Sequence, residues 1–196
     1  MNDPHMNRLR LEPVNRLRLE PGPVAATDWH GLPRLWLCAQ VTRGIRVTAS
    51  AVFAPERGTY VYSIRLLLLS PGEEGYMSAQ ERGFETAQLN TRHWVLRQAN
   101  DPPNEVHGAG VIGLFPLLRE GGWRNDRQTD ASGRVRPGEE LRGIFAYQSL
   151  SGQGTSISFE GHIDFVPGSL QQPVGDEFAV AVPRFPLSVG ADDFLF

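Results

Sequence analysis

Short stretches of alternating apolar and polar residues run through much of the chain, separated by glycine and proline. In residues 45–53 an apolar side chain stands at every second position, which is the period of a β-strand with one buried face. The same period recurs in residues 157–165, where Ile157 is the first of the apolar positions. Toward the end of residues 60–69, consecutive positions are all apolar rather than every second one, which predicts a central strand covered on both faces.

Further strands are predicted where apolar stretches lie between turn-forming segments. They cover residues 89–98, 114–118, 141–150 and 178–182. The segments 71–83 and 119–140 are expected to be polar loops, and no stretch has a convincing helical period. Six or seven short strands joined by turns predict an antiparallel β-sandwich or barrel over about residues 45–189. The residues expected in its core are Ile64, Leu66, Trp94, Phe159, Ile163 and Val180.

The two ends of the chain differ from this domain. Residues 1–44 follow neither period and are interrupted by prolines, so we expect an irregular extension. A seven-residue sequence occurs twice in it, at 7–13 and 15–21, and a recent duplication or a gene-model artefact explains this better than a designed docking arm. The chain closes with an acidic and aromatic tail, residues 190–196. Apolar side chains in both segments need cover from the domain or a partner, so the candidate interaction residues are Trp36, Leu37, Phe194 and Phe196.

Composition narrows the classes of partner and chemistry. The chain has 22 acidic and 19 basic residues and a net charge of −3, which gives no reason to expect a nucleic-acid partner. It contains no lysine, which excludes Schiff-base and P-loop lysine chemistry. The single cysteine, Cys38, excludes an intrachain disulfide. No apolar run predicts a transmembrane segment or a signal peptide, so the cytoplasm and an organelle matrix, mitochondrial or plastid, both remain open.

A glycine-rich loop at residues 108–113 fits the pattern G-x-G-x-x-G. A proline follows three residues after the last glycine, so no helix begins there and the dinucleotide-binding fingerprint fails. Two interpretations remain open. The backbone N–H groups of the loop could bind an anionic group such as pyrophosphate. Alternatively, the glycines supply positive φ angles and close backbone approach in a tight loop. The candidate anion-binding residues are Gly108, Gly110, Gly113 and Arg92.

Catalytic and metal-binding patterns are weak in the sequence. The five histidines show no i,i+2 or i,i+4 pair, so we predict no metal site and no cofactor. Glu160 and His162 project from one strand face, but solvent-facing or paired side chains account for them better than an acid–base pair. His93 is expected to be a hydrogen-bonded structural residue, and Cys38 a buried, inert thiol. The chain is therefore not expected to be an enzyme.

Several motifs occur in a recognisable order over residues 45–189. They are Arg92-His93-Trp94, the segment 106–113 with its following proline, Phe145-Ala146-Tyr147-Gln148-Ser149, Phe159-Glu160-Gly161-His162 and the closing segment 182–187. Together they resemble the ApaG family, in the style of its plant and algal members. The resemblance implies a fibronectin-III or immunoglobulin-like β-sandwich. ApaG domains form small bacterial proteins, and they form modules of F-box substrate receptors and polymerase-delta-interacting proteins.

Two functions of different classes follow from these observations. The leading one is a non-catalytic protein-interaction module, such as an accessory subunit of a larger assembly, whose partners are other proteins. The alternative is a phosphate-, pyrophosphate- or nucleotide-binding protein that uses residues 108–113, a loop for which the family resemblance also implies pyrophosphate binding. A complete ubiquitin-ligase receptor is not expected, because the proline-interrupted extension cannot form F-box helices.

Overall fold

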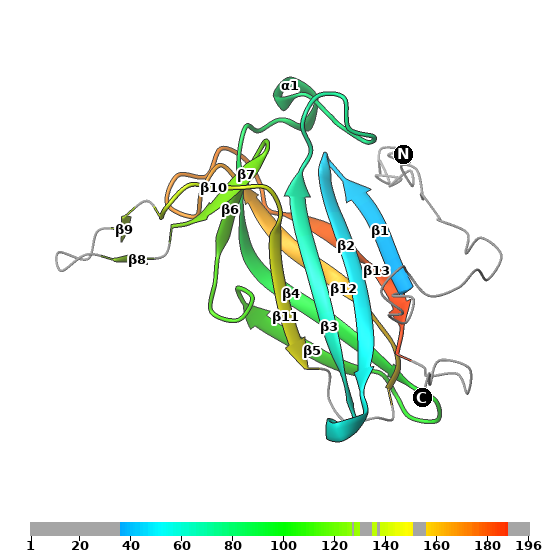
Figure 1. The fold of residues 1–196 in the computed structure, drawn as a ribbon. Helices are drawn as coiled ribbons and strands as arrows, with labels where there is room; N and C mark the ends of the chain where they lie inside the picture. Colours follow the sequence, from blue (N-terminus) through cyan, green and yellow to red (C-terminus); the bar gives the residue numbers. More distant parts are fainter. Residues whose placement is uncertain (1–35, 127, 130–134, 137, 151–155, 188–196) are drawn as a thin grey trace, which may run out of the picture.

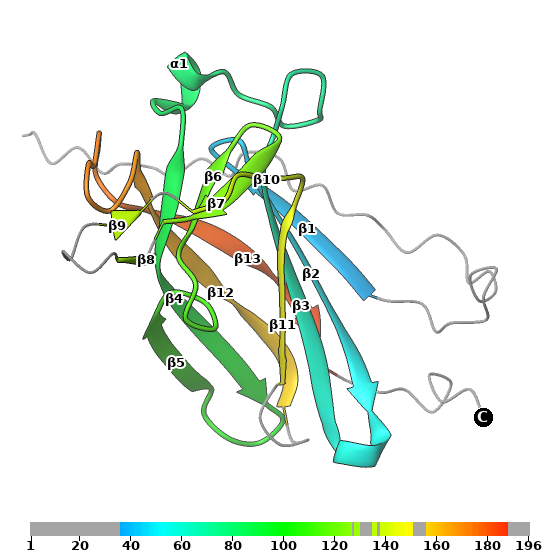
Figure 2. The ribbon, with the colours of Figure 1, turned by 60° about the vertical axis from the view of Figure 1, so that its left-hand side comes forward.

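The computed structural model describes residues 36–126, 128–129, 135–136, 138–150 and 156–187. Two antiparallel sheets face each other as the layers of a β-sandwich, which confirms the expected fold class (Figures 1 and 2). The first sheet has the order β1 (Trp36–Thr42), β2 (Ile45–Ala54), β3 (Thr59–Leu68), β11 (Phe145–Leu150). The second has the order β10 (Leu141–Arg142), β7 (Gly122–Asn125), β6 (Pro116–Arg119), β4 (Ala87–Gln98), β12 (Ser156–Pro167), β13 (Phe178–Pro186).

Smaller elements complete the described part of the chain. Strand β5 (Asn104–Ala109) pairs with the same edge of β4 that carries β6 further along. Strands β8 (Gln128–Thr129) and β9 (Val135–Arg136) form a separate two-stranded ladder. The helical elements are one 3₁₀ turn (Pro55–Arg57) and the short helix α1 (Ala79–Arg82). Within the described residues, no helix has the length and apolar character needed to cross a membrane.

The core lies between the two sheets and is rich in aromatic residues. Phe159 occupies its centre, with ring centroids of Tyr62, Trp94 and Phe185 at 4.9, 5.2 and 5.0 Å. The six residues expected in the core are all buried, as the alternation along each strand requires. They are Ile64, Leu66, Trp94, Phe159, Ile163 and Val180.

The last residues of the extension that was expected to be irregular, 36–44, are regular in the structure. Residues 36–42 form strand β1, which pairs with β2 from Trp36 opposite Ala51 to Thr42 opposite Ile45. Arg43 and Gly44 join the two strands with φ angles of 48° and 75°, the positive values that a two-residue hairpin turn needs. Alternation in residues 36–42 is weak in the sequence, so only the pairing with β2 reveals this strand. Residues 1–35, which hold the repeated sequence, lie outside the described residues, and so does the 190–196 tail.

The start of β12 also departs from the simple alternation. Ile157 was expected on the buried face, but it is 41% exposed, whereas Ser158 is 4% exposed. The register against β4 shifts between Ser156 and Ser158, which marks a β-bulge. A bulge adds one residue to one strand and so reverses the face to which the residues before it point.

The polar loop at 71–83 contains a buried anchor, Arg82, at the end of α1. Its side chain is 1% exposed and forms an ion pair of 2.9 Å with Glu120. The guanidinium also donates to the carbonyl oxygens of Phe84 and Met77, both at 2.7 Å. Burial of a charge is tolerated only when it is paired and hydrogen-bonded, so these contacts explain why a loop of polar composition is held on the domain.

We expect Arg82→Ala to lower the free energy of unfolding by about 3 kcal/mol, because it leaves buried carbonyl oxygens without donors. Urea denaturation followed by circular dichroism measures the change. The matched control is Arg142→Ala, whose side chain is exposed and whose loss should cost at most about 0.5 kcal/mol. Equal stability of the two variants would contradict an anchoring role for Arg82.

Candidate functional site

Three neighbouring strands bring three histidines into one row on the outer face of the second sheet. His93 of β4 lies opposite His107 of β5 on one side and opposite His162 of β12 on the other. Trp94 is buried in the core, and successive side chains of a strand point to opposite faces, so His93 faces outward. The rings of His93 and His107 are stacked, with centroids 3.9 Å apart and planes 12° apart. His162 meets His93 edge-on at 4.9 Å.

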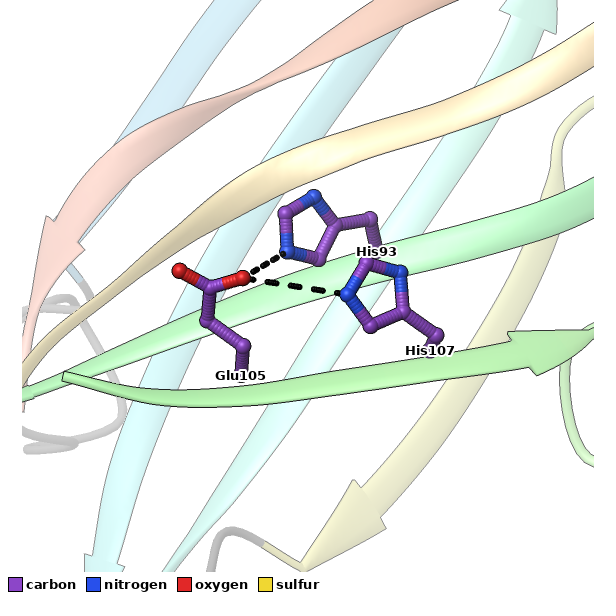
Figure 3. Close-up of side chains that lie close together, drawn as sticks. All are labelled: His93, Glu105 and His107. Carbon is purple, nitrogen blue, oxygen red and sulfur yellow. Dashed lines mark hydrogen bonds and ion pairs between the residues drawn. The ribbon is translucent and has the colours of Figure 1, made fainter.

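Carboxylates stand beside this row. Glu105 precedes His107 by two residues, so both side chains lie on the same face of β5. The Glu105 Oε2 atom lies 3.2 Å from Nε2 of His93 and 3.7 Å from Nε2 of His107 (Figure 3). At the other end of the row, Asp164 Oδ1 lies 3.7 Å from His162 Nε2, and its Oδ2 accepts a 2.6 Å hydrogen bond from the Thr91 hydroxyl.

The spacing of the histidines in the sequence gives no sign of this cluster. The ligand atoms of His93, Glu105 and His107 all lie within 4.8 Å of one another. The turn at 99–103 separates His93 from Glu105 and His107 in the sequence, and hairpin pairing across this turn places His93 opposite His107. The sequence marks the turn itself, but only the structure gives the register that aligns the two histidines. His93 has the hydrogen bond expected of a structural residue, between its Nε2 and Glu105 Oε2 at 3.2 Å.

The glycine-rich loop lies where the chain leaves β5 and enters β6. Ile112 and Gly113 have φ angles of 45° and 79°. On either side of them, Val111 and Leu114 exchange two backbone hydrogen bonds of 2.9 and 2.8 Å. This is the geometry of a two-residue hairpin turn with positive φ at both central positions. Gly113 therefore provides the conformational freedom expected of a tight loop.

The remaining candidate anion-binding residues, Gly108, Gly110 and Arg92, lie close together, and their contacts are with one another, with neighbouring parts of the loop and with β4. The Gly110 amide donates to the Asn90 carbonyl at 2.7 Å, and a Cβ atom at Gly110 would lie 2.6 Å from the Leu114 carbonyl oxygen. Arg92 Nη1 donates to the carbonyl oxygen of Gly110 at 2.5 Å, and a Cβ atom at Gly108 would lie 2.8 Å from the same nitrogen. These contacts support the tight-loop interpretation, and anion binding stays a prediction.

The structure describes only the backbone of two of the four candidate interaction residues. The backbones of Trp36 and Leu37 belong to β1, opposite Ala51 and Ser50. Phe194 and Phe196 lie outside the described residues. Glu160 pairs with Arg97 at 2.5 Å rather than with His162, as expected of a paired side chain. Cys38, expected to be buried, is only partly buried. Burial raises the pKa of the Cys38 thiol, which disfavours a reactive thiolate.

An exposed row of uncharged, mostly apolar residues follows the edge strand β11 and the residue before it. Phe145 and Tyr147 point into the core, and the alternate positions point out to solvent. The outward residues are Ile144, Ala146, Gln148 and Leu150. Ile144 is 49% exposed and Leu150 is 48% exposed, and no charged residue occurs between them. We call these four residues the edge row.

Comparison with known proteins identifies the family. A profile of the ApaG domain matches residues 52–124. Protein ApaG of Anaeromyxobacter dehalogenans is 32% identical over 133 residues, covering 66% of this chain and 96% of that protein. F-box protein SKIP16 of Arabidopsis thaliana is 36% identical over 171 residues, covering 82% of this chain. The chain spans only about a third of that F-box protein, 33% of its length.

Among solved structures, the putative ApaA protein from Bordetella pertussis matches 82% of this chain and 98% of that chain, with 22% identity and a TM-score of 0.45. The family of this chain is shown without this structural match. It is shown by the bacterial ApaG relative, almost all of whose length the chain covers, and by the matching domain profile. The chain belongs to the ApaG domain family.

Proposed function

We propose that this ApaG domain is a non-catalytic protein-interaction module that acts as an accessory part of a larger assembly, and that its edge row contacts the partner. Membership of the family, together with the similarity to an F-box protein, supports a protein-interaction role. In that relative the matching region is one third of a longer chain, which is typical of a module that works beside other domains.

The edge row is the observation that carries the proposal. β11 ends the order of the first sheet, so one of its edges has no strand partner among the described residues. Natural sheets protect such edges with charged residues, proline or bulges, because unpaired N–H and C=O groups recruit other strands. Residues 145–150 contain none of these devices. The opposite end of the same sheet differs, since β1 contacts β13 of the second sheet.

The chemistry of the row indicates the kind of partner. An extended segment of another protein would add backbone hydrogen bonds along the free edge of β11, and apolar side chains of that segment would cover Ile144 and Leu150. Affinity in this recognition mode comes from the paired main chains, and specificity comes from the side chains at alternate positions. A partner segment with apolar residues at every second position fits this surface.

The test compares the wild-type chain with Ile144→Arg and Leu150→Arg in affinity purification from the source cells, with cross-linking and mass spectrometry. An arginine at either position buries a charge without a partner, so we expect at least a tenfold loss of the co-purifying protein. Both positions are about half exposed, so the free energy of unfolding should change by less than about 1 kcal/mol.

Val174→Arg is the matched control, because Val174 is 66% exposed and lies in the turn between β12 and β13, which belong to the other sheet than β11. A protein that is recovered with the wild type and with this control, but lost with both edge variants, supports the proposal. Recovery that is unchanged in the edge variants refutes it. A homodimer in solution that the edge variants dissociate would identify a second copy, not another protein, as the partner and would also refute it.

A further inference from the structure

We propose that His93, Glu105 and His107 form a binding site for a divalent transition-metal ion, with Zn²⁺ the ion that the ligand set suits. The three residues offer two imidazole nitrogens and one carboxylate oxygen from two adjacent strands. This combination of two histidines and one glutamate is a known zinc ligand set. It lies on the outer face of the second sheet, on strands other than β11, so it is independent of the proposed protein contact.

The two distances from Glu105 to the histidine nitrogens are close to those of a tetrahedral ion. Zn²⁺ binds nitrogen and oxygen at roughly 2.0–2.2 Å, so adjacent ligand atoms of a tetrahedral site lie about 3.4 Å apart. The Glu105 Oε2 atom is 3.2 Å from His93 Nε2 and 3.7 Å from His107 Nε2 (Figure 3). These two distances therefore differ from the tetrahedral value by only a few tenths of an ångström.

The imidazole rings need one larger adjustment. They are stacked within 12° of parallel, so their in-plane lone pairs run side by side rather than toward one point. The side chain of His107 is 67% exposed and that of Glu105 is 53% exposed, so both can rotate toward the ion without displacing core residues. His93, which is 19% exposed, stays fixed on the sheet and provides the rigid ligand.

Binding also requires a definite tautomer. An imidazole that binds metal through Nε2 carries its proton on Nδ1. The ion takes the place that a proton occupies when Nε2 donates to the Glu105 carboxylate, and this negative charge then offsets part of the charge of the ion. Three protein ligands leave a fourth position open on the solvent side, where water or a group from another molecule can bind.

His162 provides an internal control within the row. Its ring meets His93 edge-on, and its Nε2 lies near Asp164 rather than near Glu105. The proposal therefore assigns His162 no bond to the ion. His5 and His30, in the part of the chain that the structure does not describe, need a separate control because free histidines also bind Zn²⁺.

The experiment is isothermal titration calorimetry of the full chain with ZnCl₂, after treatment with a chelator and its removal. We expect one equivalent of Zn²⁺ to bind to the wild type, to His162→Ala and to the double variant His5→Ala/His30→Ala. His107→Ala and Glu105→Gln should each weaken binding by at least about tenfold, since even loss of a supporting contact outside the ligand shell costs 10–100-fold. Long-range ¹H–¹⁵N spectra should show the Nε2 signals of His93 and His107 moving together when Zn²⁺ is added.

Several results would overturn the assignment. They are a wild-type chain that binds no Zn²⁺, affinity that survives in His107→Ala, and affinity that is lost in the His5/His30 double variant. A loss in His162→Ala as large as that in His107→Ala would also refute it, because it would place the ion between His93 and His162. The variants at positions 105 and 107 change exposed side chains, so unchanged thermal unfolding without metal verifies that they are folded.

Discussion

Replacing Trp94 with alanine should lower the free energy of unfolding by about 3–5 kcal/mol, the range typical of a buried large aromatic residue. The indole is 3% exposed and packs at 5.2 Å against the ring of Phe159, which itself contacts Tyr62 and Phe185. Removing the indole leaves a cavity between the sheets that these rings cannot close without leaving their rotamers. The change is measured by urea denaturation followed by circular dichroism.

Val174→Ala serves as the control for this prediction, because a side chain that is 66% exposed should cost less than about 0.5 kcal/mol on truncation. A loss below about 1 kcal/mol for Trp94→Ala would mean that the ring does not belong to the core. It would also make Trp94 a candidate for surface recognition.

Gly161→Ala should be the second severe substitution, with a loss of about 3 kcal/mol or more. A Cβ atom at Gly161 would lie 2.0 Å from the carbonyl oxygen of His93 and 3.0 Å from the Trp94 ring. The conflict is with the backbone of β4, which pairs with β12 along most of its length, so relief requires the two central strands to separate. Glycine within a strand often marks such a close approach.

The matched control is Gly175→Ala, where the nearest atom to the added methyl group would be Pro167 Cγ at an ordinary 3.5 Å. We expect this variant to retain nearly all of its stability, while Gly161→Ala loses its cooperative thermal transition or unfolds at a much lower temperature. If both alanine variants unfold at the same temperature as the wild type, the approach of β12 to β4 is looser than these distances indicate.

The two candidate sites differ in how far the local sequence determines them. The sequence predicts the glycine-rich loop, with a tight turn as one of its two interpretations. This was possible because a positive φ angle at glycine is a local property. The histidine row was missed, because its members come from three strands. His93, His107 and His162 become neighbours only through the registers of β5 and β12 on β4. No local spacing rule can detect such a group.

Local patterns in the sequence determined the fold class and the core of this protein. Alternation of apolar residues is a property of each strand alone, so Ile64, Trp94 and Val180 could be placed inside without knowledge of their neighbours. Tertiary structure decided what depends on pairing: the recruitment of residues 36–42 into β1, the bulge that turns Ile157 outward, and the meeting of His93 with Glu105 and His107. The physical reason is that strand register and bulges are set by cross-strand contacts between distant segments, and a one-residue shift reverses the face of every side chain.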